Sequence, residues 1–244
     1  MAYHGGYGYY SQPTIGELKA RAGRSIAAMR KKGRDVRPII VEGRAIAKTW
    51  WGKAWCDNLT RYADFASRIA RGKRYVRAGC VLDLVIVRGH VSALVQGTRK
   101  DPYQVEVEVR PLPPARVEAL TRSCTARAAN LEALTEGRFP EELKDALFNR
   151  DAGIFPSPAE ISFDCSCPDF ARLCKHVASA LFAVGTRLDD EPLLFFELRG
   201  IDTSSFVRKA IEQKIGDMLA NADAPSPRIL RIDDDALTEL FGVL

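Results

Sequence analysis

The stretch CSCPDFARLCKH, residues 165–176, constrains the fold of this chain more than any other segment. Its four possible metal ligands are spaced as Cys-x-Cys, a gap of six residues and Cys-x-His: Cys165, Cys167, Cys174 and His176. Three thiolates and one imidazole are the ligand types and the ligand number of a tetrahedral metal centre. A cation bound by all four would hold the two halves of this stretch together.

The two halves fit a strand followed by a helix. Side chains two apart on a strand point to the same face, so Cys165 and Cys167 can bind one cation. Positions two apart on a helix lie about 200° apart around the axis. Cys174 must therefore lie at or before the helix cap, with His176 in the first turn. The apolar spacing that starts at Val177 agrees with this placement.

Zinc is the natural occupant of such a Cys₃His set, and four protein ligands leave no coordination position for water. We expect one structural Zn²⁺ ion. Arg172 and Lys175 flank the ligands and are placed to offset the negative charge of three thiolates around a divalent cation. A catalytic Cys174–His176 pair, a redox-active Cys-x-Cys and a chance cluster of buried cysteines are the alternatives.

The rest of the chain predicts an α+β fold. Apolar residues at helical spacing from Trp51 to Ile69 predict one helix, ended by Gly72 and packed on one face of a sheet. Three β-type runs separated by short turns predict that sheet as an antiparallel meander: Cys80–Val87, Val91–Gln96 and Tyr103–Arg110.

Further helices are expected around and after the ligand stretch. Helical patterns occupy residues 115–150 and 204–221, and a third pattern runs from Val177 to Gly185, which is expected to end it. The last helix carries apolar side chains on one face: Val207, Ile211, Ile215 and Met218. Residues 193–202 fit either a strand or a short buried segment.

These patterns divide the chain into five segments. A flexible basic N-terminal arm, 1–37, precedes an α+β domain with a basic patch, 38–112, and a helical connector, 113–152. A ββα-like zinc finger, 153–187, contains the four ligands, and a mostly helical C-terminal segment spans 188–244.

Charge is distributed unevenly along the chain. Residues 1–80 hold 17 Lys and Arg against 5 Asp and Glu, a net charge of +12, whereas the remainder holds 19 against 26, a net charge of −7. A basic first third favours an acidic partner, and nucleic acid is the obvious candidate, DNA before RNA. The candidate contact residues are Arg68, Arg71, Lys73, Arg74, Tyr75 and Arg77, extended by Arg99 and Lys100. A solvated helix end and loop is the alternative interpretation.

The expected compartment is the cytoplasm. No apolar run approaches the ~20 residues that span a bilayer. The N-terminal stretch MAYHGGYGYYSQPT lacks the apolar centre of a secretory signal. Reduced cytoplasmic thiols favour metal binding over disulfides. The chain also lacks a Gly-rich phosphate loop followed by Lys and Ser or Thr, so we do not expect it to be a P-loop ATPase.

The ligand pattern, on a strand-then-helix frame, resembles the SWIM zinc finger over about residues 155–185. Four further stretches resemble bacterial SWIM zinc-finger proteins over most of the chain: TWWGKAW (49–55), RGKRYVRAG (71–79), VQGTRKDPYQVEVEV (95–109) and FELRGID (196–202). The resemblance implies a zinc-stabilised DNA- or protein-interaction module. It also implies a Swi/Snf-type helicase-like ATPase as a partner, because similar bacterial proteins are encoded beside such ATPases.

Three functional hypotheses remain. The first is a non-enzymatic adaptor whose basic first third contacts nucleic acid while a protein such as the ATPase docks elsewhere. The second is a protein–protein interaction module without direct nucleic-acid affinity, whose basic patch meets an acidic partner. The third is a nuclease or thiol enzyme that uses Cys174 and His176, although no carboxylate pair or Ser-His-Asp set accompanies them.

Overall fold

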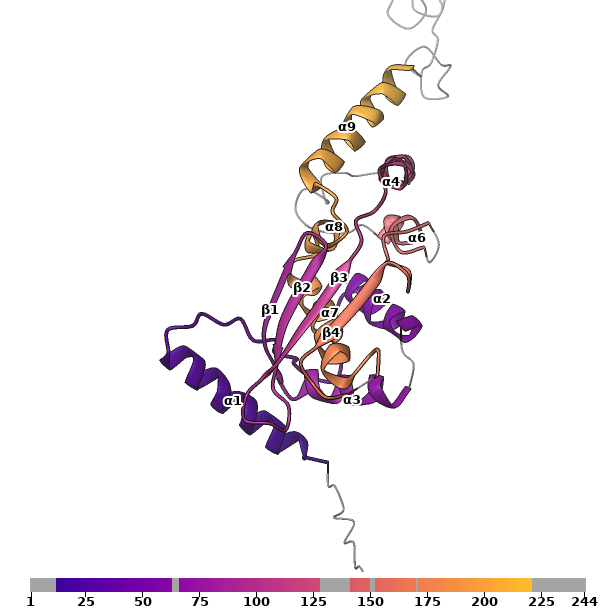
Figure 1. Cartoon of the computed structure of the whole chain (residues 1–244). Coiled ribbons are helices and arrows are strands. Elements are labelled where there is room, and N and C mark those ends of the chain that lie inside the picture. The colour runs from indigo at the N-terminus through magenta and orange to yellow at the C-terminus, as the bar shows by residue number, and fades with distance from the viewer. Residues whose placement is uncertain (1–11, 63–65, 128–140, 150–151, 170, 221–244) are drawn as a thin grey trace, which may run out of the picture.

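The centre of the fold is one four-stranded antiparallel sheet in the order β1-β2-β3-β4 (Figure 1). The computed structural model describes residues 12–62, 66–127, 141–149, 152–169 and 171–220. Its strands are β1 (Val81–Val87), β2 (His90–Val95), β3 (Tyr103–Val109) and β4 (Ile161–Cys165). The predicted α+β class is confirmed, and the three predicted β-type runs form β1, β2 and β3.

One face of this sheet is buried. In β3, Tyr103 and the three valines that follow at alternate positions are buried, while the residues between them are more exposed. Strand β4 pairs with β3 so that Cys165 lies opposite Val105 and Ile161 lies opposite Val109. Side chains directly opposite each other share a face of the sheet. The register therefore turns Cys165 toward the buried side.

The strand that carries the first ligand belongs to the same sheet as the predicted meander. Residues 110–160 separate β3 from β4 in the sequence, yet the two strands pair along the whole length of β4. The predicted segments 38–112 and 153–187 thus share one sheet and one core. The sequence composition changes at the boundaries of these two segments, but their buried residues belong to the same hydrophobic core.

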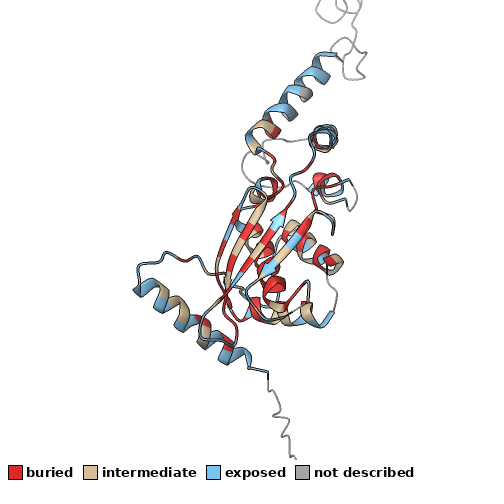
Figure 2. Cartoon of the chain, in the orientation of Figure 1, coloured by how far each residue is buried: buried red, intermediate tan, exposed pale blue. Residues whose placement is uncertain are grey.

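Helix α7 (Lys175–Asp190) lies against the buried face of the sheet (Figure 1). Eleven of its residues are buried, which is typical of a helix that is covered on all sides. Helices α2 (Trp50–Asn58) and α3 (Ala66–Arg77) pack on it away from the sheet. Figure 2 shows the buried residues gathered along α7 and the strands that face it.

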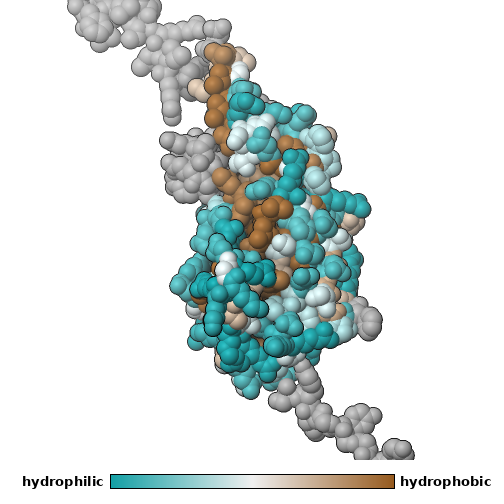
Figure 3. Space-filling model, turned by 60° about the vertical axis from the view of Figure 1, so that its left-hand side comes forward, coloured by the Kyte–Doolittle hydropathy of each residue, from teal (hydrophilic) through white to brown (hydrophobic). Residues whose placement is uncertain are grey.

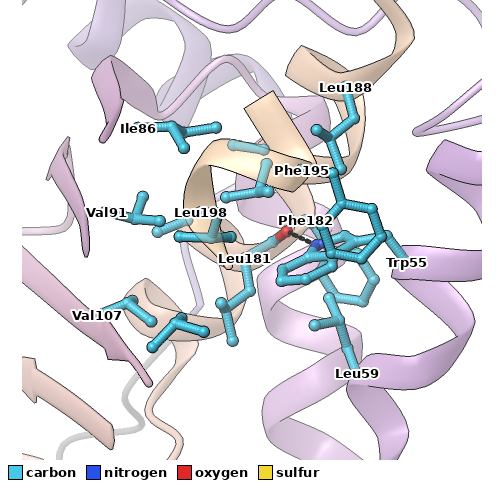
Figure 4. Close-up of a cluster of buried hydrophobic side chains, with 14 of the residues drawn as sticks. Trp55, Leu59, Ile86, Val91, Val107, Leu181, Phe182, Leu188, Phe195 and Leu198 are labelled. Atoms are coloured by element: carbon cyan, nitrogen blue, oxygen red, sulfur yellow. Dashed lines mark hydrogen bonds between the residues drawn. The ribbon is translucent and has the colours of Figure 1, made fainter. Parts of the chain in front are cut away.

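Aromatic side chains fill the space between α7 and α2. Trp55 is fully buried, and its indole Nε1 donates a hydrogen bond to the carbonyl of Leu181 at 2.7 Å (Figure 4). Its ring meets Phe195 edge-on with centroids 5.4 Å apart. Phe195 belongs to the short helix α8 (Leu194–Leu198). Residues 193–202 therefore contain a short buried helix, and the strand interpretation is wrong.

Two predicted helix ends are wrong. The helix expected from Trp51 to Gly72 is divided into α2, the 3₁₀ turn η1 (Leu59–Tyr62) and α3, and Gly72 lies inside α3. A Cβ atom at Gly72 would lie 2.5 Å from the Cβ of Ala178 on α7. Gly185 lies inside α7, where a Cβ would lie 2.6 Å from the Cys56 sulfur. Both glycines allow helices to approach closely, and neither ends one.

Replacing Gly72 by Ala is expected to lower the free energy of unfolding by about 1–3 kcal/mol, because the added methyl group overpacks the α3–α7 contact. Alanine's higher helix propensity, worth up to about 1 kcal/mol, offsets only part of this. Gly23→Ala is the matched control, since Gly23 lies within a helix and a Cβ there meets nothing within 4 Å. Urea unfolding followed by circular dichroism measures both. Equal effects at the two positions would contradict the packing explanation.

Helix α1 (Ile15–Lys31) lies within the described part, 12–37, of the predicted N-terminal arm. Thr14 and Glu17 form a capping box at its start, and Leu18 and Ala22 are buried. Helix α1 therefore buries two apolar side chains against the rest of the protein. Residues 1–11 lie outside the described part of the chain.

The remaining helices lie at the end of the molecule opposite α1 (Figure 1). They are α4 (Pro114–Arg127), η2 (Glu141–Leu143), α6 (Lys144–Leu147) and α9 (Thr203–Ala220). The connector's residues 128–140 are outside the described ranges. On α9, Ile211, Ile215 and Met218 are each at least 40% exposed, so most of the predicted apolar stripe faces solvent. None of the described helices combines the length and apolar character required to cross a membrane.

Candidate metal centre

The structure brings the four predicted ligands together. Their ligand atoms all lie within 4.8 Å of one another. The Nδ1 atom of His176 lies 3.8 Å from the sulfur of Cys165 and 4.0 Å from that of Cys174. Tetrahedral zinc with Zn–S bonds of ~2.3 Å places its sulfurs about 3.8 Å apart. The cluster fits a zinc site after a small contraction, with Nδ1 as the imidazole ligand.

The end of β4 supplies the first two ligands. Beyond Cys165, the Ser166 N–H donates to the carbonyl of Gln104 at 3.0 Å, and the Ser166 hydroxyl accepts from the Gln104 N–H at 2.9 Å. Pairing with β3 therefore continues to Ser166. The chain then bends over residues 166–168, just beyond the end of β4, and this bend brings the Cys167 sulfur within 4.8 Å of the other three ligand atoms.

The start of α7 supplies the other two ligands. Cys174 is the N-cap residue, with extended backbone angles, and its sulfur accepts a hydrogen bond from the Val177 N–H at 3.4 Å. His176 follows as the second residue of the helix. This is the placement that the helix geometry demanded of a Cys-x-His pair. Sulfur at a helix N-terminus is also stabilised as thiolate by the free N–H groups there.

Aromatic rings hold the imidazole of His176. The ring of Tyr103 stacks on it with centroids 4.1 Å apart and an interplanar angle of 22°. Tyr75 meets it edge-on at 5.7 Å. Gly97 makes room for this packing, because a Cβ there would lie 2.4 Å from the Tyr103 ring and 3.0 Å from Nε2. The Nε2 atom is buried without a hydrogen-bond partner among the described residues, so the rings rather than a hydrogen bond orient this ligand.

The electrostatics favour the metal-binding forms of two ligands. A hydrogen bond from the Cys165 thiol lowers the pKa of Cys174 to about 4 against the effect of burial, aided by His176 and the Val177 N–H. The same hydrogen bond, followed by burial, raises the pKa of Cys165. Burial lowers the pKa of His176 and so favours the neutral imidazole. A cation would replace the proton that the thiols share, which is the usual exchange at thiolate sites.

Arg172 and Lys175, the two cations that flank the ligands in the sequence, contact residues that surround the cluster. The Arg172 guanidinium donates to the carbonyls of Pro158 at 2.8 Å and Ile161 at 3.4 Å. It thereby ties the start of β4 to the loop between the ligand pairs. The Lys175 ammonium lies 6.0 Å from the ring centroid of Tyr75.

Arg68, predicted as a nucleic-acid contact, anchors the ligand loop. Its guanidinium makes two contacts with the Asp169 carboxylate, at 3.0 and 3.1 Å, and both side chains are at most 24% exposed. Asp169 lies between Cys167 and Cys174. The paired Arg–carboxylate geometry, one of the stronger ion-pair arrangements, fastens this loop to α3.

Three of the other predicted contacts on α3 form hydrogen bonds or a cation–ring contact within the protein, and a fourth, Tyr75, is buried. The Arg74 guanidinium donates to the carbonyl of Pro13, and that of Arg77 donates to the carbonyl of Arg44. Lys73 lies over the ring of Phe182 on α7, and Tyr75 is only 5% exposed. Arg71 is half-buried.

The last two predicted contacts lie elsewhere. Arg99 and Lys100 are exposed on the loop between β2 and β3. They line a groove together with residues of α1. Sequence reasoning missed the cations of α1 as their neighbours, because that contact joins segments some 70 residues apart: the Ser25 hydroxyl donates to the Gln96 side chain at 2.6 Å.

Comparisons with known proteins agree with the geometry of the centre. Residues 164–185 match the SWIM zinc finger family. Over 173 residues the chain is 33% identical to the protein of Mycobacterium tuberculosis described as "Uncharacterized protein Rv2102". The matched region covers 67% of this chain and 62% of that relative, so the chain spans less than two thirds of the relative's length. No solved structure matches the chain.

Proposed function

Because this chain contains a SWIM zinc finger, we propose that it is a non-enzymatic interaction protein that uses one structural zinc ion and binds nucleic acid. The observation that carries the proposal is the Cys₃His cluster at the junction of β4 and α7. Zinc bound there would join the sheet to its central helix and stabilise the surfaces built on both.

The donor set supports a structural role for the metal. Four protein ligands complete a tetrahedral shell and leave no position for a reacting water molecule. Cys174 and His176 are 2% and 1% exposed, so neither is accessible to a substrate as a nucleophile or base. These observations favour an interaction protein over a nuclease or thiol enzyme.

The charge distribution supports nucleic acid as the partner. The net charge of +12 in residues 1–80 provides the attraction for a polyanion. The SWIM resemblance also supports a Swi/Snf-type helicase-like ATPase as a protein partner, and such an ATPase would itself act on DNA.

Direct binding to DNA is the expected result with the purified full chain. Fluorescence anisotropy with labelled single-stranded and duplex DNA should show binding. The logarithm of the association constant should fall linearly with the logarithm of salt concentration between about 50 and 200 mM, because phosphate contacts release counterions. Lack of binding to either form at low salt would remove nucleic acid from the proposal.

One observation favours the protein–protein alternative. The end of α9 exposes Ile215, Met218 and Leu219 by 52%, 67% and 70%. Contiguous apolar residues on a surface often mark protein contacts. Co-purification after nuclease treatment tests this alternative, because a partner retained without nucleic acid contacts the protein itself. ATP hydrolysis in the retained fraction would identify the expected class of partner.

A further inference from the structure

A basic groove lies between α1 and the loop that joins β2 to β3. Its volume is about 840 Å³, and among the described residues that line it only Asp101 is acidic. Figure 3, with the α1 side turned forward, shows hydrophilic side chains over the lower part of the molecule. The lining cations are Arg21, Arg24, Lys32, Arg34, Arg99 and Lys100.

Five of these six cations are exposed on the surface, where a partner can reach them. The sixth, the half-buried Arg21, donates from Nη1 to the carbonyl of Thr98 at 2.9 Å. Within the described ranges, none of the six forms an ion pair with Asp or Glu. Arg68 on α3 differs from them, because Asp169 neutralises it. Like charges gathered in a concave surface raise the local potential and attract anions.

The walls of the groove are held in place before any partner binds. The Arg21–Thr98 and Ser25–Gln96 hydrogen bonds join α1 to the β2–β3 loop. The Gln96 amide in turn donates to the carbonyl of Arg99 at 2.7 Å. A site with fixed walls loses less conformational entropy on binding than one that must be assembled.

The β2–β3 loop, which forms one wall of the groove, is connected to the metal centre through Tyr103. The Arg99 guanidinium lies 5.6 Å from the ring centroid of Tyr103. The same ring stacks on the ligand His176. The groove is therefore built on the part of the fold that the zinc ion would stabilise.

We propose that this groove binds the sugar–phosphate backbone of single-stranded nucleic acid. The proposal rests on the nucleic-acid function proposed above and names its interface. Duplex DNA is read by protein elements that project into its grooves, whereas a concave surface with cations on both walls suits one flexible strand. Ala28, Met29 and Leu94 also line the groove and offer apolar surface to the bases.

The test compares two triple variants of the full chain that remove the same charge. The groove variant is Arg24→Ala/Lys32→Ala/Lys100→Ala. The control variant, Lys53→Ala/Arg110→Ala/Lys144→Ala, replaces exposed cations outside the groove. Anisotropy titrations use a labelled mixed-sequence single strand and the matching duplex at several salt concentrations. Circular dichroism melts verify that both variants fold.

On a single strand, each phosphate contact adds ~0.7 to the slope of the logarithm of the association constant against the logarithm of salt concentration. The groove variant loses three such contacts, so its slope should be shallower by about two. Its association constant at 0.1 M salt should be roughly 100-fold lower than that of the wild type. The control variant should stay within a few-fold of the wild type. Equal losses in both variants would overturn the groove while leaving nucleic-acid binding intact. Tighter wild-type binding to duplex than to single strand would overturn the choice of partner. No wild-type binding at low salt would overturn both this proposal and the function on which it rests.

Discussion

Removing the zinc ion is expected to unfold the protein. Structural zinc sites contribute about 10–16 kcal/mol of apparent binding free energy at neutral pH, which is comparable to the whole stability of a typical domain, about 5–15 kcal/mol. Here the ligands join the end of β4 to the start of α7, the helix around which the core is packed. The loss should therefore affect the whole core rather than one loop.

Elemental analysis should find one zinc ion per chain, and chelation should abolish the cooperative unfolding transition followed by circular dichroism. Cys174→Ser should prevent stoichiometric zinc binding. Cys56→Ser is the matched control, since Cys56 is a half-buried free thiol outside the cluster. The control should retain zinc and a cooperative transition. A metal-free protein with wild-type stability would refute the structural zinc site.

Glu160→Gln is expected to lower the free energy of unfolding by about 3–5 kcal/mol, because it leaves a buried charge without its partner. Arg199 is fully buried, and its Nη2 atom lies 3.0 Å from the Glu160 carboxylate. The Nη1 atom donates to the carbonyl of Arg110 at 2.5 Å. These contacts connect the end of α8 to the end of β3 and the start of β4, so their loss should loosen the sheet at the end opposite α1.

Glu191→Gln provides the control for this variant. Glu191 pairs with Arg187 at 3.3 Å, but its side chain is 45% exposed. Exposed pairs contribute roughly 0–1 kcal/mol. Urea unfolding at neutral pH should therefore separate the two variants clearly. A Glu160→Gln protein as stable as Glu191→Gln would show that the buried pair does not stabilise the fold.

The effect of Glu160→Gln should depend on pH. Burial raises the pKa of Glu160, but hydrogen bonds from Ser157 and Arg199 outweigh it and hold that pKa below the ordinary 4.5. A lowered folded-state pKa stabilises the protein fully above the unfolded-state value, and this contribution is lost as pH falls through the folded-state value. The stability difference between wild type and Glu160→Gln should therefore narrow as the pH falls below 4.5.

The local features of the metal centre were predictable from the sequence. Spacing alone required Cys174 at the cap of α7 and His176 in its first turn, since backbone geometry permits no other way for both to reach one cation. Strict alternation likewise identified β3, because its two faces meet different environments. Both arguments use only neighbours in the sequence.

The use of individual side chains could not be predicted in this way. In the sequence, Gly72 and Gly185 look like glycines that end helices, yet each lies inside a helix. A neighbouring helix approaches so closely at both positions that a Cβ atom would clash with it. Arg68 looks like any cation in a basic run until Asp169, about a hundred residues later, neutralises it.

The sequence by itself determined the ligand set, the strand-and-helix frame that presents it, and the excess of positive charge in the first third of the chain. Only the tertiary structure decided that β4 joins the meander, that Arg68 of α3 pairs with Asp169, and that the cations of α1 face the β2–β3 loop. Ligand spacing and alternation act through covalent geometry over a few residues. Strand pairing, ion pairing and groove formation depend on which distant segments bury their apolar faces together.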